Sequence, residues 1–161
     1  MKKIILGTNR FSKLIREDGY FVDKTLMIKD FLERKKQVTI ITRPRLFGKT
    51  INITMMSEFF DNTKDSKKLF KGTKIMDTSY ASEINQYPTL FFSFSNARSN
   101  KETIISEIRS QIINEWTKYD FVFTDLNKDE KIKYETCKHV LINWKDDDFI
   151  GITDVVSFLI E

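Results

Sequence analysis

The chain has 161 residues, 40% of them apolar, and it contains fourteen Phe. This length and composition fit one folded domain with a substantial core and exclude a disordered chain. Lys and Arg number 27 against 23 Asp and Glu, and the net charge of +4 permits an anionic partner without arguing for one. We expect a single domain over residues 1–161.

Several classes of site and location can be set aside. A single cysteine, Cys137, excludes an intrachain disulfide and a cysteine-based metal site. His139 has no partner for nucleophilic chemistry and is expected on a helix surface, so we identify no catalytic side chain. The apolar run Ile4–Leu6 is shorter than the roughly seven residues of a signal peptide, and no stretch is long enough to span a membrane. We therefore expect a cytoplasmic protein.

The first half of the chain alternates helical and extended patterns. A short amphipathic segment, 11–15, ends before Gly19, and an extended stretch then leads into a helix over 25–34. The β-branched run 38–42 predicts a buried parallel strand, which Pro44 ends.

After Thr50, apolar residues at helical spacing predict a helix to about Asn62, and a lysine-rich linker follows. The run 89–95 predicts a second buried strand. Helices are expected at 100–118, with Ser99 or Asn100 as N-cap, at 132–144 and at 152–160. The consecutive acids Asp146–Asp148 are interpreted as a solvated turn rather than a metal site.

The most informative motif is Gly48-Lys49-Thr50, which stands between the predicted strand 38–42 and a predicted helix. In a P-loop, glycine lets backbone amides approach phosphate, lysine neutralises it, and the hydroxyl can bind Mg²⁺. The standard P-loop pattern has a further glycine where this chain has Arg43. The alternative is a plain turn that enters a helix.

Four segments in this order carry a family resemblance: "YFVDKTLMIKDFLE", "VTIITRPRLFGKTINITMMSEFF", "LFKG" and "YPTLFFSFS". They resemble the N-terminal part of the AAA-ATPase-like family of predicted prokaryotic P-loop ATPases, whose loop resembles Arg-Pro-Arg-Arg-Phe-Gly-Lys-Thr. Leu46 stands where that loop usually has a second basic residue. The resemblance implies ATP and Mg²⁺ as cofactors. It assigns Gly48, Lys49 and Thr50 to the phosphates, Thr50 also to the metal, and Arg43 and Arg45 to their flanks.

The resemblance also covers the signature Asp23-Lys24-Thr25. For this signature a packing role and nucleotide contact both remain open.

The predicted fold is α/β, a truncated P-loop NTPase-like domain with a small parallel sheet flanked by helices. A P-loop hydrolase also needs a carboxylate at the end of another strand, which the family supplies as an apolar strand ending in Asp-Glu. No such strand occurs in these residues. We therefore expect nucleotide binding with little or no hydrolysis, and an uncovered sheet edge that suits a protein partner or a homodimer.

An alternative from another class is a non-enzymatic interaction protein. In that reading a truncated ATPase domain acts as a regulator or inhibitor from a mobile element, for example an anti-CRISPR protein of bacterial or phage origin. Nucleic-acid binding is not expected, because Trp116, Trp144 and the Phe residues fall at core spacing and are not interleaved with a basic patch.

Overall fold

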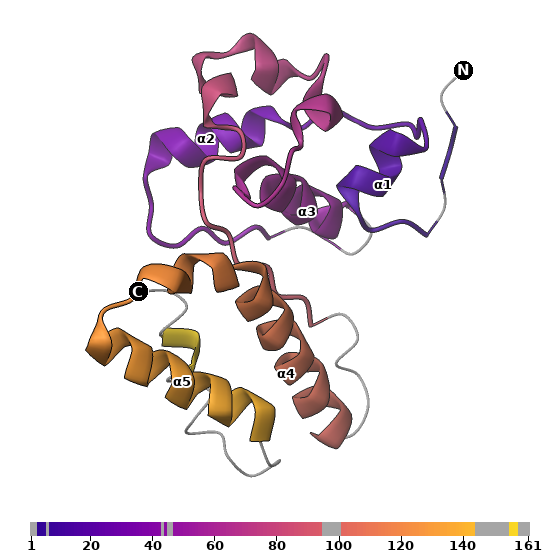
Figure 1. Cartoon of the computed structure of the whole chain (residues 1–161). Coiled ribbons are helices and arrows are strands. Elements are labelled where there is room, and N and C mark those ends of the chain that lie inside the picture. The colour runs from indigo at the N-terminus through magenta and orange to yellow at the C-terminus, as the bar shows by residue number, and fades with distance from the viewer. Residues whose placement is uncertain are drawn as a thin grey trace. The chain divides into compact units, whose positions relative to one another are not determined.

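Helices dominate the fold, and their contacts divide the chain into two compact units, 1–90 and 91–161. The computed structural model (Figure 1) describes residues 3–5, 7–42, 44, 47–94, 101–143 and 155–157. This division into compact units does not test whether residues 1–161 form a single domain, which stays a prediction. In chain order the helical elements are α1 (Phe11–Arg16), α2 (Leu26–Arg34), α3 (Lys49–Phe60), three 3₁₀ helices η1 (Lys67–Phe70), η2 (Lys74–Asp77) and η3 (Ser79–Glu83), then α4 (Lys101–Lys118), the 3₁₀ helix η4 (Asp120–Asp125) and α5 (Lys128–Asn143).

The predicted parallel sheet is wrong for the part of the chain that the structure describes, which contains no strand, only two isolated bridges. Residues 38–42 are extended, but no backbone hydrogen bond joins them to another described segment. Val38 is 76% and Ile40 is 80% exposed, so this run is not buried. An apolar β-branched run becomes a strand only where a neighbouring strand completes its hydrogen bonds. The second predicted strand is also without strand structure over 89–94, and residue 95 lies outside the described residues.

The helix predictions are largely confirmed. The predicted 25–34 and 100–118 correspond to α2 and α4, and the helix expected after Thr50 is α3. The fifth helix, α5, begins at Lys128, before the predicted start at residue 132. Of the last predicted helix only 155–157 is described, and it is helical, whereas Asp146–Asp148 and the predicted N-cap residues Ser99 and Asn100 lie outside the described residues.

The core of the first unit is built from α1, α2, α3 and the 3₁₀ helices of the lysine-rich segment. Phe59 is fully buried, and its ring lies 5.3 Å from that of Phe70 in an edge-to-face contact. Phe70 also lies 5.0 Å from Phe11 of α1. The segment expected as a lysine-rich linker therefore supplies core residues. The buried apolar cluster of this unit comprises Phe11, Ile28, Met55, Phe59, Phe60, Leu69, Phe70, Ile75 and Ile84.

The same short turn occurs twice in the first unit. Asp23 Oδ1 accepts hydrogen bonds from the backbone N (2.8 Å) and the hydroxyl (2.7 Å) of Thr25. Asp61 Oδ1 binds the N (3.0 Å) and the hydroxyl (2.7 Å) of Thr63 in the same way. Such local bonds fix the direction of the chain at a turn. One turn leads into α2, and the other ends α3.

The second unit rests on an aromatic stack between α4, η4 and α5. The Trp116 ring is stacked at 5.3 Å on both Phe123 and Tyr134. From α4, the Arg109 guanidinium donates to the carbonyl oxygens of Leu141 (3.1 Å) and Ile142 (2.6 Å). Carbonyls in the last turn of a helix have no partner within it, so Arg109 caps the end of α5.

Candidate nucleotide site at the start of helix α3

The Gly48-Lys49-Thr50 motif forms the start of α3. Gly48 is the N-cap residue, with a left-handed backbone (φ 72°, ψ 21°), and no side chain caps this end. The backbone N of Asn52 bonds to the Gly48 oxygen at 3.0 Å. By helix geometry, the amides of residues 49–51 therefore precede the first helical bond, at the end where the helix dipole is positive. The described residues before Gly48 contain no paired strand of the kind that precedes a P-loop.

Gly48 leaves room for a ligand. A Cβ atom added there would meet no atom within 4 Å, so its surroundings within the chain do not require a glycine. The positive φ does favour glycine, because the left-handed conformation is costly for most side chains.

Lys49 reaches back over its own loop. Its Nζ donates a hydrogen bond to the Pro44 carbonyl oxygen at 2.8 Å, in exposed surroundings. A lysine ammonium is a mobile point charge on a flexible stem, so it can exchange this carbonyl for a phosphate oxygen. Thr50 is exposed in the first turn of α3. Arg43 and Arg45 lie outside the described residues.

The donor set fits the phosphate groups of a nucleotide better than it fits a bare metal. Among the described residues, no three His, Cys, Asp or Glu side chains gather to hold an ion. Mg²⁺ usually keeps waters and binds through one or two protein oxygens plus phosphates. In this site the Thr50 hydroxyl would supply the protein oxygen, and the phosphates and waters would supply the rest.

Two residues of the signature Asp23-Lys24-Thr25 have a packing role. Asp23 Oδ2 accepts a hydrogen bond from the Lys74 amide at 2.8 Å, and the Ile75 amide donates to the hydroxyl of the fully buried Thr25 at 3.1 Å. Burial raises the pKa of Asp23, but the hydrogen bonds from Thr25 and Lys74 outweigh it and hold the pKa below its usual value. Asp23 and Thr25 thus join the chain before α2 to η2, a packing role. Lys24 is exposed instead.

A pocket of about 290 Å³ lies beside Gly48. Its walls come from the end of α1, the extended segment 20–24 and the first turn of α3. Our sequence reasoning missed this pocket. The one local signal in the sequence was Asn52, a polar residue within the apolar helical pattern of Ile51, Met55 and Met56. In the structure Asn52 is only 8% exposed. The lining residues are Leu14, Tyr20, Phe21, Val22, Lys24, Phe47, Gly48, Ile51 and Asn52.

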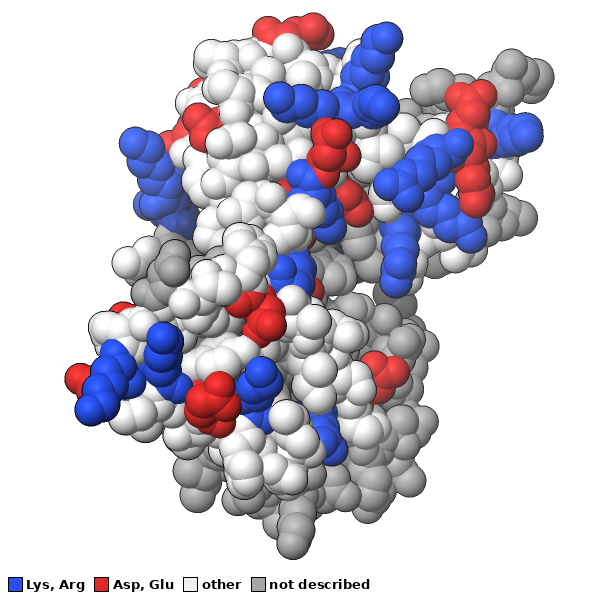
Figure 2. All heavy atoms as spheres, in the orientation of Figure 1, with Lys and Arg blue, Asp and Glu red and all other residues white. Residues whose placement is uncertain are grey.

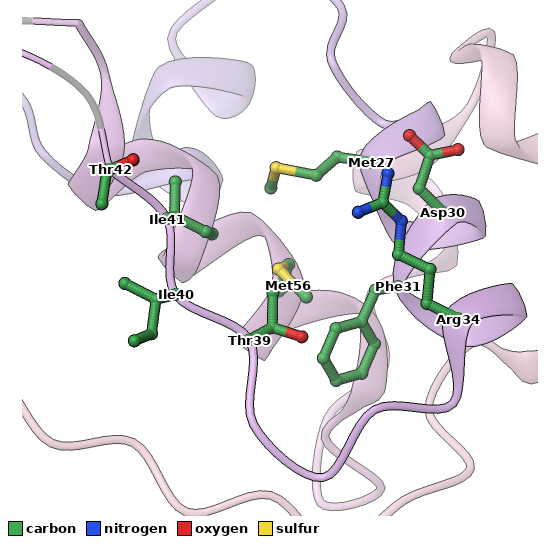
Figure 3. A pocket seen from close by; sticks show the side chains of 9 residues that line it. All are labelled: Met27, Asp30, Phe31, Arg34, Thr39, Ile40, Ile41, Thr42 and Met56. Carbon is green, nitrogen blue, oxygen red and sulfur yellow. The ribbon is translucent and has the colours of Figure 1, made fainter.

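A second pocket, of about 280 Å³, lies between α2, residues 39–42 and Met56 of α3 (Figure 3). Ile41 points toward Met27 and Met56, whereas Ile40 points away from them. Asp30 and Arg34 of α2 also line it. Of residues 39–42, Ile41 is half-buried and the other three are exposed, so the segment packs against the helices mainly through Ile41.

The described residues on the face shown in Figure 2 form no continuous basic patch of the kind that binds nucleic acid. On the face shown in Figure 2, Lys and Arg side chains are interspersed with Asp and Glu.

Within the described part of the chain, no helix is both long enough and apolar enough to cross a membrane. His139 is exposed on α5, as predicted.

A family described as predicted AAA-ATPase matches residues 5–150, well over half of the chain. The chain belongs to the AAA-ATPase-like family. Among curated proteins and among solved structures, nothing matches it significantly. For an AAA-ATPase-like chain, a nucleotide with Mg²⁺ is the general expectation, and the start of α3 has the residue types that such a ligand needs.

Proposed function

We propose that this chain binds a magnesium nucleotide, ATP in the first instance, at the start of α3. The observation that carries the proposal is the Gly48-Lys49-Thr50 motif placed at the uncapped N-terminus of a twelve-residue helix, in a chain of this family. The amides and dipole of that end attract an anion. Lys49 adds a full positive charge, and its Nζ donates to the Pro44 carbonyl oxygen of the same loop at 2.8 Å. From the sequence, Arg43 and Arg45 would add charge on the same loop.

We further propose that these 161 residues bind the nucleotide without turning it over. Faster ATP hydrolysis requires interactions that stabilise the transition state, and binding of the phosphates in the ground state is not enough. The sequence has no apolar strand followed by Asp-Glu to orient the attacking water. A protein that supplies such a carboxylate would complete the site.

Calorimetric titration of Mg-ATP into the wild-type chain and Lys49→Ala tests binding. A charged hydrogen bond is worth about 1.5–3 kcal/mol, so we expect the variant to bind roughly 10- to 150-fold more weakly. Lys71→Ala removes the same charge from an exposed residue of the same unit and should leave affinity unchanged. Titration at two temperatures guards against an enthalpy near zero. Absence of binding by the folded wild-type chain would refute the proposal.

A phosphate-release assay on the same samples tests turnover. We expect no release above a control without protein. Release that disappears in Lys49→Ala would show that these residues hydrolyse ATP on their own.

A second candidate function, protein–protein interaction, is favoured by one observation. Val38 and Ile40 are 76% and 80% exposed in an extended segment that no described strand covers. Exposed extended apolar chain is a template for pairing. The role as a mobile-element inhibitor, including the anti-CRISPR example, and a cytoplasmic location stay predictions. A protein of this kind would still bind its partner protein as the Lys49→Ala variant and would lose that binding as Val38→Lys. A protein whose activity depends on nucleotide would lose activity in Lys49→Ala and keep it in Val38→Lys.

A further inference from the structure

The pocket beside Gly48 has a composition that suits a flat, partly polar ligand. We propose that it is a base subsite of the nucleotide site and that it prefers adenine, an inference that rests on the proposed function. Pockets for drug-sized ligands run from about 300 to 1,000 Å³. A space of about 290 Å³ therefore suits one planar ring system rather than a whole nucleotide.

Exposed aromatic side chains gather at this pocket. Tyr20 is 64% and Phe47 is 60% exposed, and Val22 beside them is 58% exposed. Single exposed apolar residues are ordinary, but several around one concavity mark a binding site. Every base has a flat π face that stacks on an aromatic ring.

Asn52 supplies the polar contact. It is only 8% exposed and lines the same pocket, and no hydrogen bond of its side chain is formed to any described residue. Its amide is therefore available to form hydrogen bonds with a ligand in the pocket. An amide offers one donor and one acceptor, which match N7 and the N6 amino group of adenine. Guanine presents two acceptors at the same edge and would leave the amide oxygen unpaired.

The proposed phosphate site at the start of α3 adjoins the pocket, because both include Gly48. Gly48 lines the pocket and also caps α3, and Asn52 stands one helical turn further on, with its N bonded to the Gly48 oxygen at 3.0 Å. Lys24 also lines the pocket, so a second positive charge stands near the path between base and phosphates. All these residues belong to the first unit.

Three ligands separate the base from the phosphates: Mg-ATP, Mg-GTP and magnesium tripolyphosphate, which has no base. We expect wild type to bind ATP more tightly than GTP and both more tightly than tripolyphosphate. Tyr20→Ala should weaken ATP binding roughly 5- to 150-fold, the range measured for lost stacking, and leave tripolyphosphate unchanged. Tyr20→Phe keeps the ring and should retain the affinity for ATP. Phe94→Ala removes an exposed aromatic residue from the other unit and serves as the control.

Asn52→Leu keeps the size of the side chain without its amide. We expect it to bring the affinities for ATP and GTP close together. Because Asn52 is buried, a folding check by circular dichroism accompanies it, and Tyr20→Ala, at an exposed position, carries the test if Asn52→Leu does not fold.

The outcomes distinguish the subsite from the proposed function. If ATP and tripolyphosphate both bind, Lys49→Ala weakens both, and Tyr20→Ala leaves ATP unchanged, the subsite is wrong while the phosphate site stands. If no ligand binds the folded wild-type chain, the phosphate site fails and the subsite with it. Selective loss of ATP in Tyr20→Ala would support the subsite.

Discussion

The carboxylate of Asp23 accepts a hydrogen bond from the backbone amide of Lys74 at 2.8 Å and so ties the chain before α2 to η2. With its other oxygen the same carboxylate fixes Thr25. One side chain thus holds two distant parts of the first unit, next to the segment that lines the pocket.

Asp23→Asn should destabilise the first unit by about 1–3 kcal/mol, because the substitution removes the charge and one of the two acceptor oxygens. Hydrogen exchange of α1–α3 followed by mass spectrometry in increasing urea would measure the change. Asp65→Asn makes the same chemical change at an exposed position and should have no effect. Equal protection in both variants would contradict the assigned packing role.

The stability that Asp23 contributes should depend on pH. Its pKa is lowered in the folded chain, so its contribution is fully present above the unfolded pKa of about 3.9. The contribution is lost as the pH falls through the lower, folded value. The difference in exchange stability between wild type and Asp23→Asn should therefore be constant above about pH 5 and shrink steadily below about pH 4. A difference that grows on acidification would show that the sign is wrong.

Phe70→Ala should cost about 3–5 kcal/mol, since Phe70 is fully buried between Phe11 and Phe59. Because domains are stable by only about 5–15 kcal/mol, amide protection in α1 and α3 should largely disappear. Lys68→Ala changes an exposed neighbour in the same 3₁₀ helix and should stay within about 0.5 kcal/mol of wild type. Similar behaviour of the two variants would mean that the lysine-rich segment is not core.

Gly48→Ala should weaken Mg-ATP binding and cost about 1–2 kcal/mol at the start of α3, because alanine disfavours the positive φ. Asparagine tolerates this conformation better, so Gly48→Asn should be milder in stability. Gly7 has a similar φ of 76° and equally open surroundings, so Gly7→Ala imposes the same strain elsewhere. Titration of ATP into all three separates strain from function, and weaker binding by Gly7→Ala would show that the effect is not local.

Local patterns predicted the helices well, and features that depend on distant residues were missed. The apolar spacing in α2, α3 and α4 is visible within each segment, and the predicted bounds differ little from those observed. Whether 38–42 is a strand depends on a hydrogen-bonded neighbour, which a single run of residues does not reveal. The 3₁₀ helices have too few turns to show a period, so buried Leu69 and Phe70 were hidden among lysines.

The candidate site shows the same division. Gly48, Lys49 and Thr50 were found because they are consecutive and carry a known pattern. The pocket was not, since Tyr20 and Asn52 come from separate elements that only the fold brings around one space. Arg43 and Arg45 remain predictions from the sequence.

Both tryptophans and the sole cysteine belong to residues 91–161. Trp116 is 4% exposed, and Cys137 is buried on α5. A melting curve followed by indole fluorescence or thiol labelling will therefore report on residues 91–161. The unit that holds Gly48 has no native indole or thiol of its own. An indole introduced at Phe47, beside that glycine, would give the nucleotide site its own optical signal.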